Sequence, residues 1–107
     1  MFVLGVDPGL SRCGYGCVEQ RGRAQRAIAA GVIATPPSAS VPARLAELQR
    51  EFRALLIELQ PAVVVVERVL FQANVRTAMS VGQASGVIMA EAAARGCEVA
   101  EYSPNEV

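Results

Sequence analysis

The sequence predicts an α/β fold, a five-stranded mixed sheet flanked by helices, in which a three-strand antiparallel meander precedes two parallel strands. Three observations predict it. Three apolar segments with short turns open the chain, a segment with helical period follows, and a run of four valines separates that segment from a second helical one. Short turns join antiparallel neighbours, whereas strand, helix and strand in succession require a parallel crossover. The expected order is β-β-β-α-β-α-β.

The first three strands are expected at residues 2–6, 14–19 and 24–34. Pro8 and Gly9 end the first strand, because proline has no N–H to donate and glycine admits turn conformations. A turn that contains Gly22 joins the second strand to the third. Turns this short give the antiparallel meander.

The first helix is expected in the segment whose last apolar position is Leu59, and Pro61 stops it. Residues 35–42 are expected to form a loop, because their three prolines bar a helix. The apolar positions then recur at steps of three and four residues, which is one face of an amphipathic helix. They are Leu45, Leu48, Phe52, Leu55, Leu56 and Leu59.

The second half of the chain predicts a strand at 62–66, a helix at about 75–95 that Gly96 ends, and a strand at 97–101. Residues 102–107 are expected to form a loop that starts a third helix. The valine run shows no alternation, so we expect it to be buried on both faces, with helices on both sides of the sheet. One side of the second helix is expected to carry Ala78, Val81, Ser85, Ile88, Met89 and Ala92.

Composition excludes several functions. The chain of 107 residues is 52% apolar, enough for one core, and no apolar run approaches the ~18 residues that a membrane span needs. No histidine is present, which removes Ser-His and Cys-His catalysis and histidine-ligated metals. The net charge is zero, so nucleic-acid binding would need a local patch. Cys13 and Cys17 lack the second pair of ligands that a zinc site requires, so we expect both thiols to lie in the core. We expect the protein to be cytoplasmic.

Two acids stand where apolar strands end. Asp7, the only Asp of the chain, follows the first strand, and Glu67 follows the valine run. If these strands are neighbours, the two carboxylates meet at the edge where α/β sheets place ligands. Carboxylates that close repel each other, and a hard divalent cation such as Mg²⁺ or Mn²⁺ relieves the repulsion. The alternative, that each acid merely ends a strand and faces water, stays open on the pattern alone.

Three segments of the chain form motifs that occur in a fixed order. The first is Gly5-Val6-Asp7-Pro8-Gly9, followed by Gly14-Tyr15-Gly16. The second is Val65-Val66-Glu67-Arg68-Val69, followed by Asn74-Val75-Arg76-Thr77-Ala78 and Gly82-Gln83-Ala84-Ser85-Gly86-Val87. The third is Tyr102-Ser103-Pro104-Asn105-Glu106-Val107. Together, and in this order, the three segments resemble RuvC-type Holliday-junction resolvases.

The resemblance implies a ribonuclease-H-like fold and a homodimer that makes paired symmetric nicks in four-way junction DNA during recombination and repair. It also implies partners among the junction-binding and branch-migration helicase proteins of the same pathway. Asp7 and Glu67 correspond to two of the family's four metal-binding acids, which hold two Mg²⁺ ions, with Mn²⁺ as a substitute. The other two acids belong to a C-terminal helix that follows the matched segments. We therefore expect residues 1–107 to form a single nuclease domain that is incomplete at its C-terminus and nearly inactive alone.

Two surfaces are predicted from the residues around these motifs. The predicted DNA contacts are Arg12, Arg68, Leu70, Phe71, Gln72, Asn74, Arg76 and Thr77, where arginines meet phosphates and an aromatic ring stacks on a base. The family often has an aromatic residue at the position of Leu70. In this chain the nearest aromatic residue is Phe71, the next residue. Asn74 as a plain N-cap and Phe71 as a core residue remain alternatives. The predicted dimer surface is Ala78, Gly82, Ser85 and Met89, and packing of this face onto the parent sheet is the alternative.

Three other functions compete with this interpretation. Sugar-kinase and actin-like ATPases also open with a strand, an Asp and nearby glycines, and ATP-dependent stabilisation would identify them. A RuvC-like nuclease that processes ribosomal RNA shares the fold and the acids, and cleavage of structured RNA would identify it. A non-catalytic binding module would bind junctions without cutting them.

Overall fold

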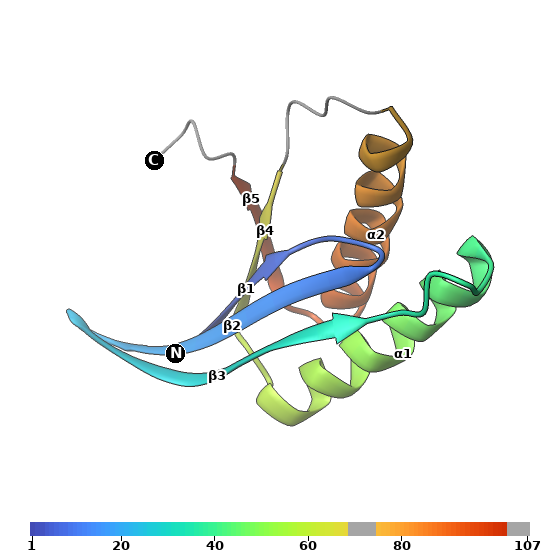
Figure 1. Ribbon diagram of the computed structural model, residues 1–107. Helices are drawn as coiled ribbons and strands as arrows, with labels where there is room; N and C mark the ends of the chain where they lie inside the picture. The colour runs from blue at the N-terminus through green and yellow to red at the C-terminus, as the bar shows by residue number, and fades with distance from the viewer. Residues whose placement is uncertain (69–74, 103–107) are drawn as a thin grey trace.

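A computed structural model describes residues 1–68 and 75–102 and shows a five-stranded mixed sheet with two helices (Figure 1). The strands are β1 (Phe2–Asp7), β2 (Arg12–Arg21), β3 (Ala24–Ala34), β4 (Val63–Glu67) and β5 (Glu98–Tyr102), and the helices are α1 (Val41–Leu59) and α2 (Val75–Ala94). The strand order is β3-β2-β1-β4-β5. Strands β1, β2 and β3 pair antiparallel, and β4 pairs parallel with both β1 and β5. The predicted element order and mixed sheet are confirmed.

The register of the sheet gives each of its faces a distinct set of side chains. Leu4 pairs with Val64 and Val6 with Val66, and these four side chains are buried against the helices. Successive side chains of a strand point to opposite faces. The residues between and after them, Gly5, Val65, Asp7 and Glu67, therefore belong to the other face.

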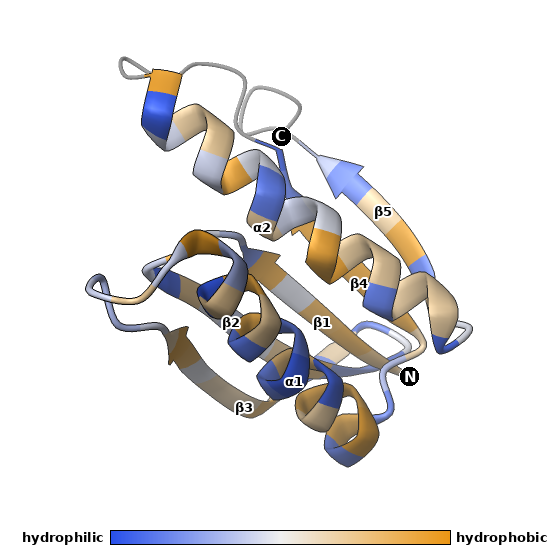
Figure 2. Cartoon of the chain, turned by 90° about the vertical axis from the view of Figure 1, so that its right-hand side faces the viewer, coloured by the Kyte–Doolittle hydropathy of each residue, from blue (hydrophilic) through white to orange (hydrophobic). Residues whose placement is uncertain are grey.

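Both described helices cover one face of the sheet, which corrects the expectation of helices on both sides (Figure 2). The crossovers from β3 to β4 and from β4 to β5 run in the same direction along the sheet. Right-handed crossovers that share a direction put their helices on the same face. Val63 and Val65 are accordingly only half-buried. The core comprises Leu4, Val6, Cys13, Cys17, Ile33, Leu48, Phe52, Leu55, Leu56, Val64, Val66, Ala84, Ile88 and Ala92.

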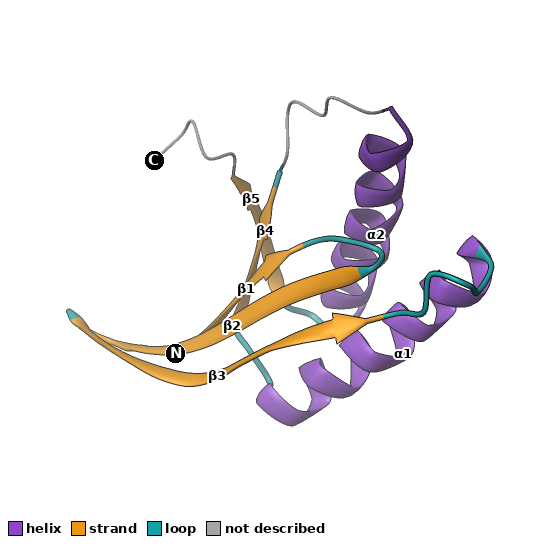
Figure 3. Cartoon of the chain, viewed as in Figure 1, coloured by secondary structure: helices purple, strands orange, loops and turns teal. Residues whose placement is uncertain are grey.

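Helix α1 begins earlier than the prolines suggest. Ser40 is its N-cap, and the Ser40 hydroxyl accepts a hydrogen bond from the Ala43 N–H at 3.4 Å. Pro42 lies in the first turn, where a proline costs no hydrogen bond because the first N–H groups have no partner within the helix. The expectation that Pro42 bars a helix was therefore wrong. The loop that leads from β3 into α1 is short (Figure 3).

The buried side of α2 agrees with the predicted one at Ile88 and Ala92 and differs from it elsewhere. Ala84, Ile88, Glu91 and Ala92 are buried, whereas Ala78 of the predicted side is exposed. Glu91 is only 7% exposed because α1 supplies its partners. The Arg53 guanidinium donates to both Glu91 carboxylate oxygens, at 2.6 and 3.1 Å, and the Gln49 amide donates at 2.8 Å. A carboxylate that is bonded in this way is stable in a largely apolar helix interface.

We expect Glu91→Gln to lower the melting temperature at pH 7, because it removes the ion pair with Arg53. The decrease should be only a few degrees, since half of the Arg53 side chain faces solvent, which screens the pair. The hydrogen bond from Arg53 is the main reason why the pKa of Glu91 lies below its ordinary value. A carboxyl group with a lowered folded-state pKa contributes stability above its unfolded pKa, about 4.3, and loses it as the pH falls through the folded value. The gap between parent and variant should therefore close in acid. Thermal unfolding from pH 7 to 3 measures it, with the exposed Glu58→Gln as control. A gap that persists at pH 3 contradicts the ion-pair explanation.

Two further expectations concern the thiols and the membrane. Cys13 and Cys17 are free and buried in the core, as predicted. Burial raises the pKa of the Cys13 thiol to about 11, so it stays protonated at neutral pH. Neither helix of the described residues combines the length and the apolar character that crossing a membrane requires.

Tyr102 ends β5 and does not lie in a loop, because the β4–β5 ladder extends to it. The other residues of the expected loop, 103–107, lie outside the described part.

Candidate active site

Asp7 and Glu67 end two neighbouring parallel strands at the same edge of the sheet. The last pair in the β1–β4 ladder is Val6 with Val66, so the two acids follow at equivalent positions. Both belong to the face that α1 and α2 leave uncovered, where Asp7 is exposed and Glu67 half-buried. The geometry that the sequence predicted for the two acids is therefore present. Their role as metal ligands remains a prediction.

A shallow hollow of about 260 Å³ opens beside the two acids. Besides Asp7 and Glu67 it is lined by Gly5, Val6, Gly14, Tyr15, Gly16 and Tyr102. A Cβ on Gly14 would lie 4.0 Å from the Asp7 Cβ, and one on Gly16 would meet no atom within 4 Å. Since no side chain rises from these glycines, the approach to the two carboxylates is open.

The electrostatics of the acid pair favour a cation. Partial burial, the negative charge of Asp7 and hydrogen bonding between the two carboxyl groups all raise the pKa of Glu67 above its ordinary value. Deprotonating Glu67 beside Asp7 is therefore unfavourable, and a bound divalent cation would stabilise the two ionised carboxylates. Carboxylate oxygens are the ligands that Mg²⁺ and Mn²⁺ prefer, so the donors fit such an ion. Within residues 1–68 and 75–102, however, no three acidic, Cys or His side chains gather at one point, so the described site offers a pair of ligands.

The predicted DNA-contact residues that the structure describes fall into three groups. Arg12 is exposed at the start of β2, two residues before Gly14, the residue that pairs with Asp7. Arg68 follows Glu67 directly, and its backbone N–H donates to the Tyr102 carbonyl at 2.6 Å. Arg76 and Thr77 are exposed at the start of α2. The remaining residues of the prediction lie outside the described part of the chain: Leu70, Phe71, Gln72 and Asn74.

The predicted dimer surface is only partly accessible. Ala78 and Gly82 are exposed, Ser85 is half-buried, and Met89 packs against the core of its own chain. A Cβ on Gly82 would meet no atom within 4 Å, so nothing in the described chain uses the close approach that this glycine permits. The dimer contact remains a prediction for all four residues, and Met89 also packs against the core of its own chain.

The sequence interpretation missed one residue of the hollow. Tyr102 pairs with Glu67 in the β4–β5 ladder and lines the hollow beside both acids. Extending the β5 alternation by one residue would have placed its side chain on the face of Glu67. Because residues 102–107 were expected to form a loop, the expected strand ended at residue 101 and did not include Tyr102.

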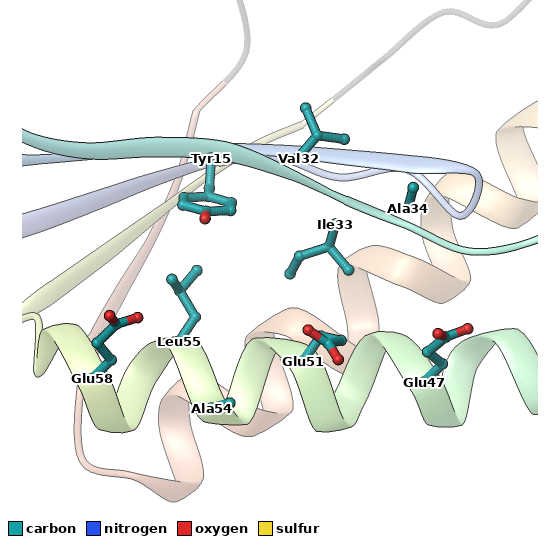
Figure 4. A pocket seen from close by; sticks show the side chains of 9 residues that line it. All are labelled: Tyr15, Val32, Ile33, Ala34, Glu47, Glu51, Ala54, Leu55 and Glu58. Atoms are coloured by element: carbon teal, nitrogen blue, oxygen red, sulfur yellow. The ribbon is translucent and has the colours of Figure 1, made fainter.

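A larger cavity, of about 450 Å³, lies elsewhere. It is formed between β3 and α1, and Tyr15, Leu55 and three glutamates of α1 contribute side chains to it (Figure 4). The glutamates are Glu47, Glu51 and Glu58. Because α1 covers the face opposite Asp7 and Glu67, the larger volume does not identify the chemical site.

Comparison with known proteins matches residues 3–107 to the family described as "Crossover junction endodeoxyribonuclease RuvC". A curated relative of that name from Salinispora arenicola is 49% identical over 108 residues, with all of this chain and 62% of the relative covered. The one from Syntrophomonas wolfei is 43% identical over 107 residues, with the same coverage. The chain spans 55% to 66% of the length of the curated relatives compared.

Solved structures agree with the family match. The structure described as "T. thermophilus RuvC in complex with Holliday junction substrate" superposes with a TM-score of 0.91 at 28% identity, over 99% of this chain and 68% of that one. The yeast mitochondrial Holliday junction resolvase Ydc2 gives 0.73 at 18% identity, over 96% and 53%. An Aquifex aeolicus PPX-GPPA enzyme gives 0.54 at 14% identity, over 99% and 37%. The last two likenesses show the fold alone.

Because the family match extends from residue 3 to residue 107, the chain belongs to the RuvC family of crossover junction endodeoxyribonucleases.

Proposed function

We propose that the protein is a metal-dependent endonuclease that resolves four-way DNA junctions by paired symmetric nicks. The observation that carries the proposal is the pair Asp7 and Glu67, side by side on the open face at the carboxyl ends of β1 and β4. The family match supports the reaction class. The superposition on a relative described with its Holliday junction substrate supports the choice of DNA.

In this proposal the residues of the chain bind, orient and admit the substrate. Asp7 and Glu67 hold Mg²⁺, with Mn²⁺ as a substitute. The divalent ions, when bound, supply the polarisation that activates water and stabilises the leaving oxygen. Gly14 and Gly16 leave room for a phosphodiester backbone beside the acids. Arg12 neutralises a phosphate at the same edge of the sheet.

The proposed assembly is a homodimer that acts with the junction-binding and branch-migration helicase proteins. A four-way junction has two-fold symmetry, so two copies of this site related by a two-fold axis fit symmetric nicking. The exposed positions Ala78 and Gly82 at the N-terminal half of α2 support a contact there.

Nick mapping on a synthetic four-way junction tests the function. The assay uses the chain itself and the chain joined to the segments of the Salinispora arenicola relative that it does not match. We expect the extended protein to make symmetric nicks that require Mg²⁺, and to cut linear duplex of the same sequence far more slowly. Preferential cutting of structured RNA, or stabilisation by ATP without junction cutting, would overturn the proposal in favour of the two competing enzyme classes. Junction binding without any cutting would indicate a binding module.

Arg12 provides a separate test of the DNA surface. We expect Arg12→Ala to weaken binding to every junction sequence alike, and to reduce the slope of log affinity against log salt concentration by about one. The measurement is a salt titration of junction binding in Ca²⁺ without Mg²⁺. Arg23→Ala is the matched control, since Arg23 is exposed at the turn between β2 and β3, at the far end of the sheet from Asp7. Equal slopes for the two variants would exclude Arg12 as a phosphate contact.

A further inference from the structure

The turn that follows Asp7 is built tightly. It consists of residues 8–11 and leads from β1 into β2, and Pro8 and Leu10 are buried in it. A Cβ on Gly9 would lie 2.3 Å from the Arg12 carbonyl oxygen, so only glycine fits there without a shift of the backbone. The conformation of this turn sets where the end of β1, and therefore Asp7, is held.

Thr35 fastens this turn from the end of β3. Its side chain is among the few buried polar ones, at 4% exposure. The Thr35 hydroxyl donates to the Leu10 carbonyl at 2.6 Å, and the Thr35 backbone N–H donates to the Ser11 carbonyl at 3.2 Å. Two consecutive carbonyl groups of the turn are thus satisfied by one residue. Figure 3 shows the β1–β2 turn and the loop after β3 at the same end of the sheet.

Arg44 of α1 completes the network. Its Nε donates to the Thr35 hydroxyl oxygen at 3.0 Å, and its Nη2 donates to the Ser11 hydroxyl at 2.7 Å. The Thr35 hydroxyl therefore uses its proton toward Leu10 and a lone pair toward Arg44. The planar guanidinium reaches both oxygens with a fixed fork, which a lysine amine cannot reproduce.

We propose that Thr35 and Arg44 are positioning residues for the reaction, which act by holding the β1–β2 turn so that Asp7 keeps the orientation needed to bind the metal. The proposal rests on the proposed function. Groups that hold a metal ligand in place commonly contribute tenfold or more to metal affinity, although they do not touch the metal. A network with a purely structural role would instead stabilise the start of α1 without affecting the ion.

The test is a Mg²⁺ titration of the extended protein described above, followed by the NMR shifts of the amides of Asp7, Glu67 and their neighbours. We expect Thr35→Val and Arg44→Gln each to raise the dissociation constant for Mg²⁺ about tenfold. Thr35→Ser restores the hydroxyl and should bind Mg²⁺ as the parent does. Hydrogen exchange of the turn amides, measured without Mg²⁺, should be faster in Thr35→Val than in the parent.

Arg53→Gln is the matched control. It removes an arginine of the same helix with two hydrogen bonds to a buried partner, Glu91, but none to the turn. It should lower the melting temperature and leave the affinity for Mg²⁺ unchanged. Equal affinities for Mg²⁺ in Thr35→Val, Arg44→Gln and the parent would overturn the positioning role while the metal site stands. If Mg²⁺ moves no amide near Asp7 in the parent itself, the metal site of the proposed function is wrong and the positioning role falls with it.

Discussion

Replacing Asp7 with Asn is expected to lower the rate of Mg²⁺-dependent junction cleavage on the order of a thousandfold. Asn keeps the size of the side chain but removes the charge that a hard cation needs, and metal ions contribute several kcal/mol to the stabilisation of such a reaction. The measurement is single-turnover cleavage by the extended protein described above. Glu51→Gln, an exposed acid of α1 on the opposite side of the sheet, is the control and should cut at the parental rate. Near-parental cutting by Asp7→Asn would exclude Asp7 from the metal site.

The same substitution should stabilise the metal-free chain. Burial and, after it, the charge of Asp7 and hydrogen bonding to Asp7 raise the pKa of Glu67, so the folded state binds its proton more tightly than the unfolded state does. Only the contribution of Asp7 changes in the variant. This contribution is fully present below the unfolded pKa and is lost as the pH rises through the folded value, so the repulsion is at its full strength at pH 7. Asp7→Asn removes the repulsion. Its melting temperature in EDTA should exceed that of the parent at pH 7, and the difference should shrink toward pH 4. A variant that is both inactive and less stable would instead point to a structural role for Asp7.

Phe52→Ala is expected to have the largest effect on stability, about 3–5 kcal/mol of the free energy of unfolding. Phe52 is completely buried between α1 and the sheet, and it is the largest of the fully buried side chains. A loss of this size is a large share of the roughly 5–15 kcal/mol that stabilises a typical domain. The melting temperature should therefore fall by more than about ten degrees.

Urea unfolding at 25 °C measures this loss, with Ile57→Ala as the control. Ile57 lies on the same helix but is 50% exposed, so its truncation should cost far less. If the two variants lost similar stability, α1 would not pack against the sheet through Phe52.

Local patterns accounted for most of the fold. Strands β1 and β2 end where Pro8 and Gly22 interrupt the chain, and Pro61 follows the end of α1. Helix α1 shows its helical period in leucines and Phe52 alone. Such patterns arise from the geometry of one element at a time, so they can be read without knowledge of the neighbours. The pairing of Asp7 with Glu67 also followed, because parallel strands bring their carboxyl ends to one edge. The start of α1 did not follow, since a proline has opposite meanings in a loop and in the first turn of a helix.

What the sequence determined by itself is the order of the elements, the mixed sheet and the two acids at the edge. The tertiary structure alone decided which face the helices cover, that α2 buries Ala84 and Glu91 beside Ile88 and Ala92, and that Tyr102 lies in the hollow. It also decided the partners of the buried polar groups, Arg53 with Glu91 and Arg44 with Thr35. Those pairs join residues that are far apart along the chain or on different elements. Their contact depends on the direction of a crossover and the rotation of a helix, which are properties of the packed molecule and leave no periodic trace in the sequence.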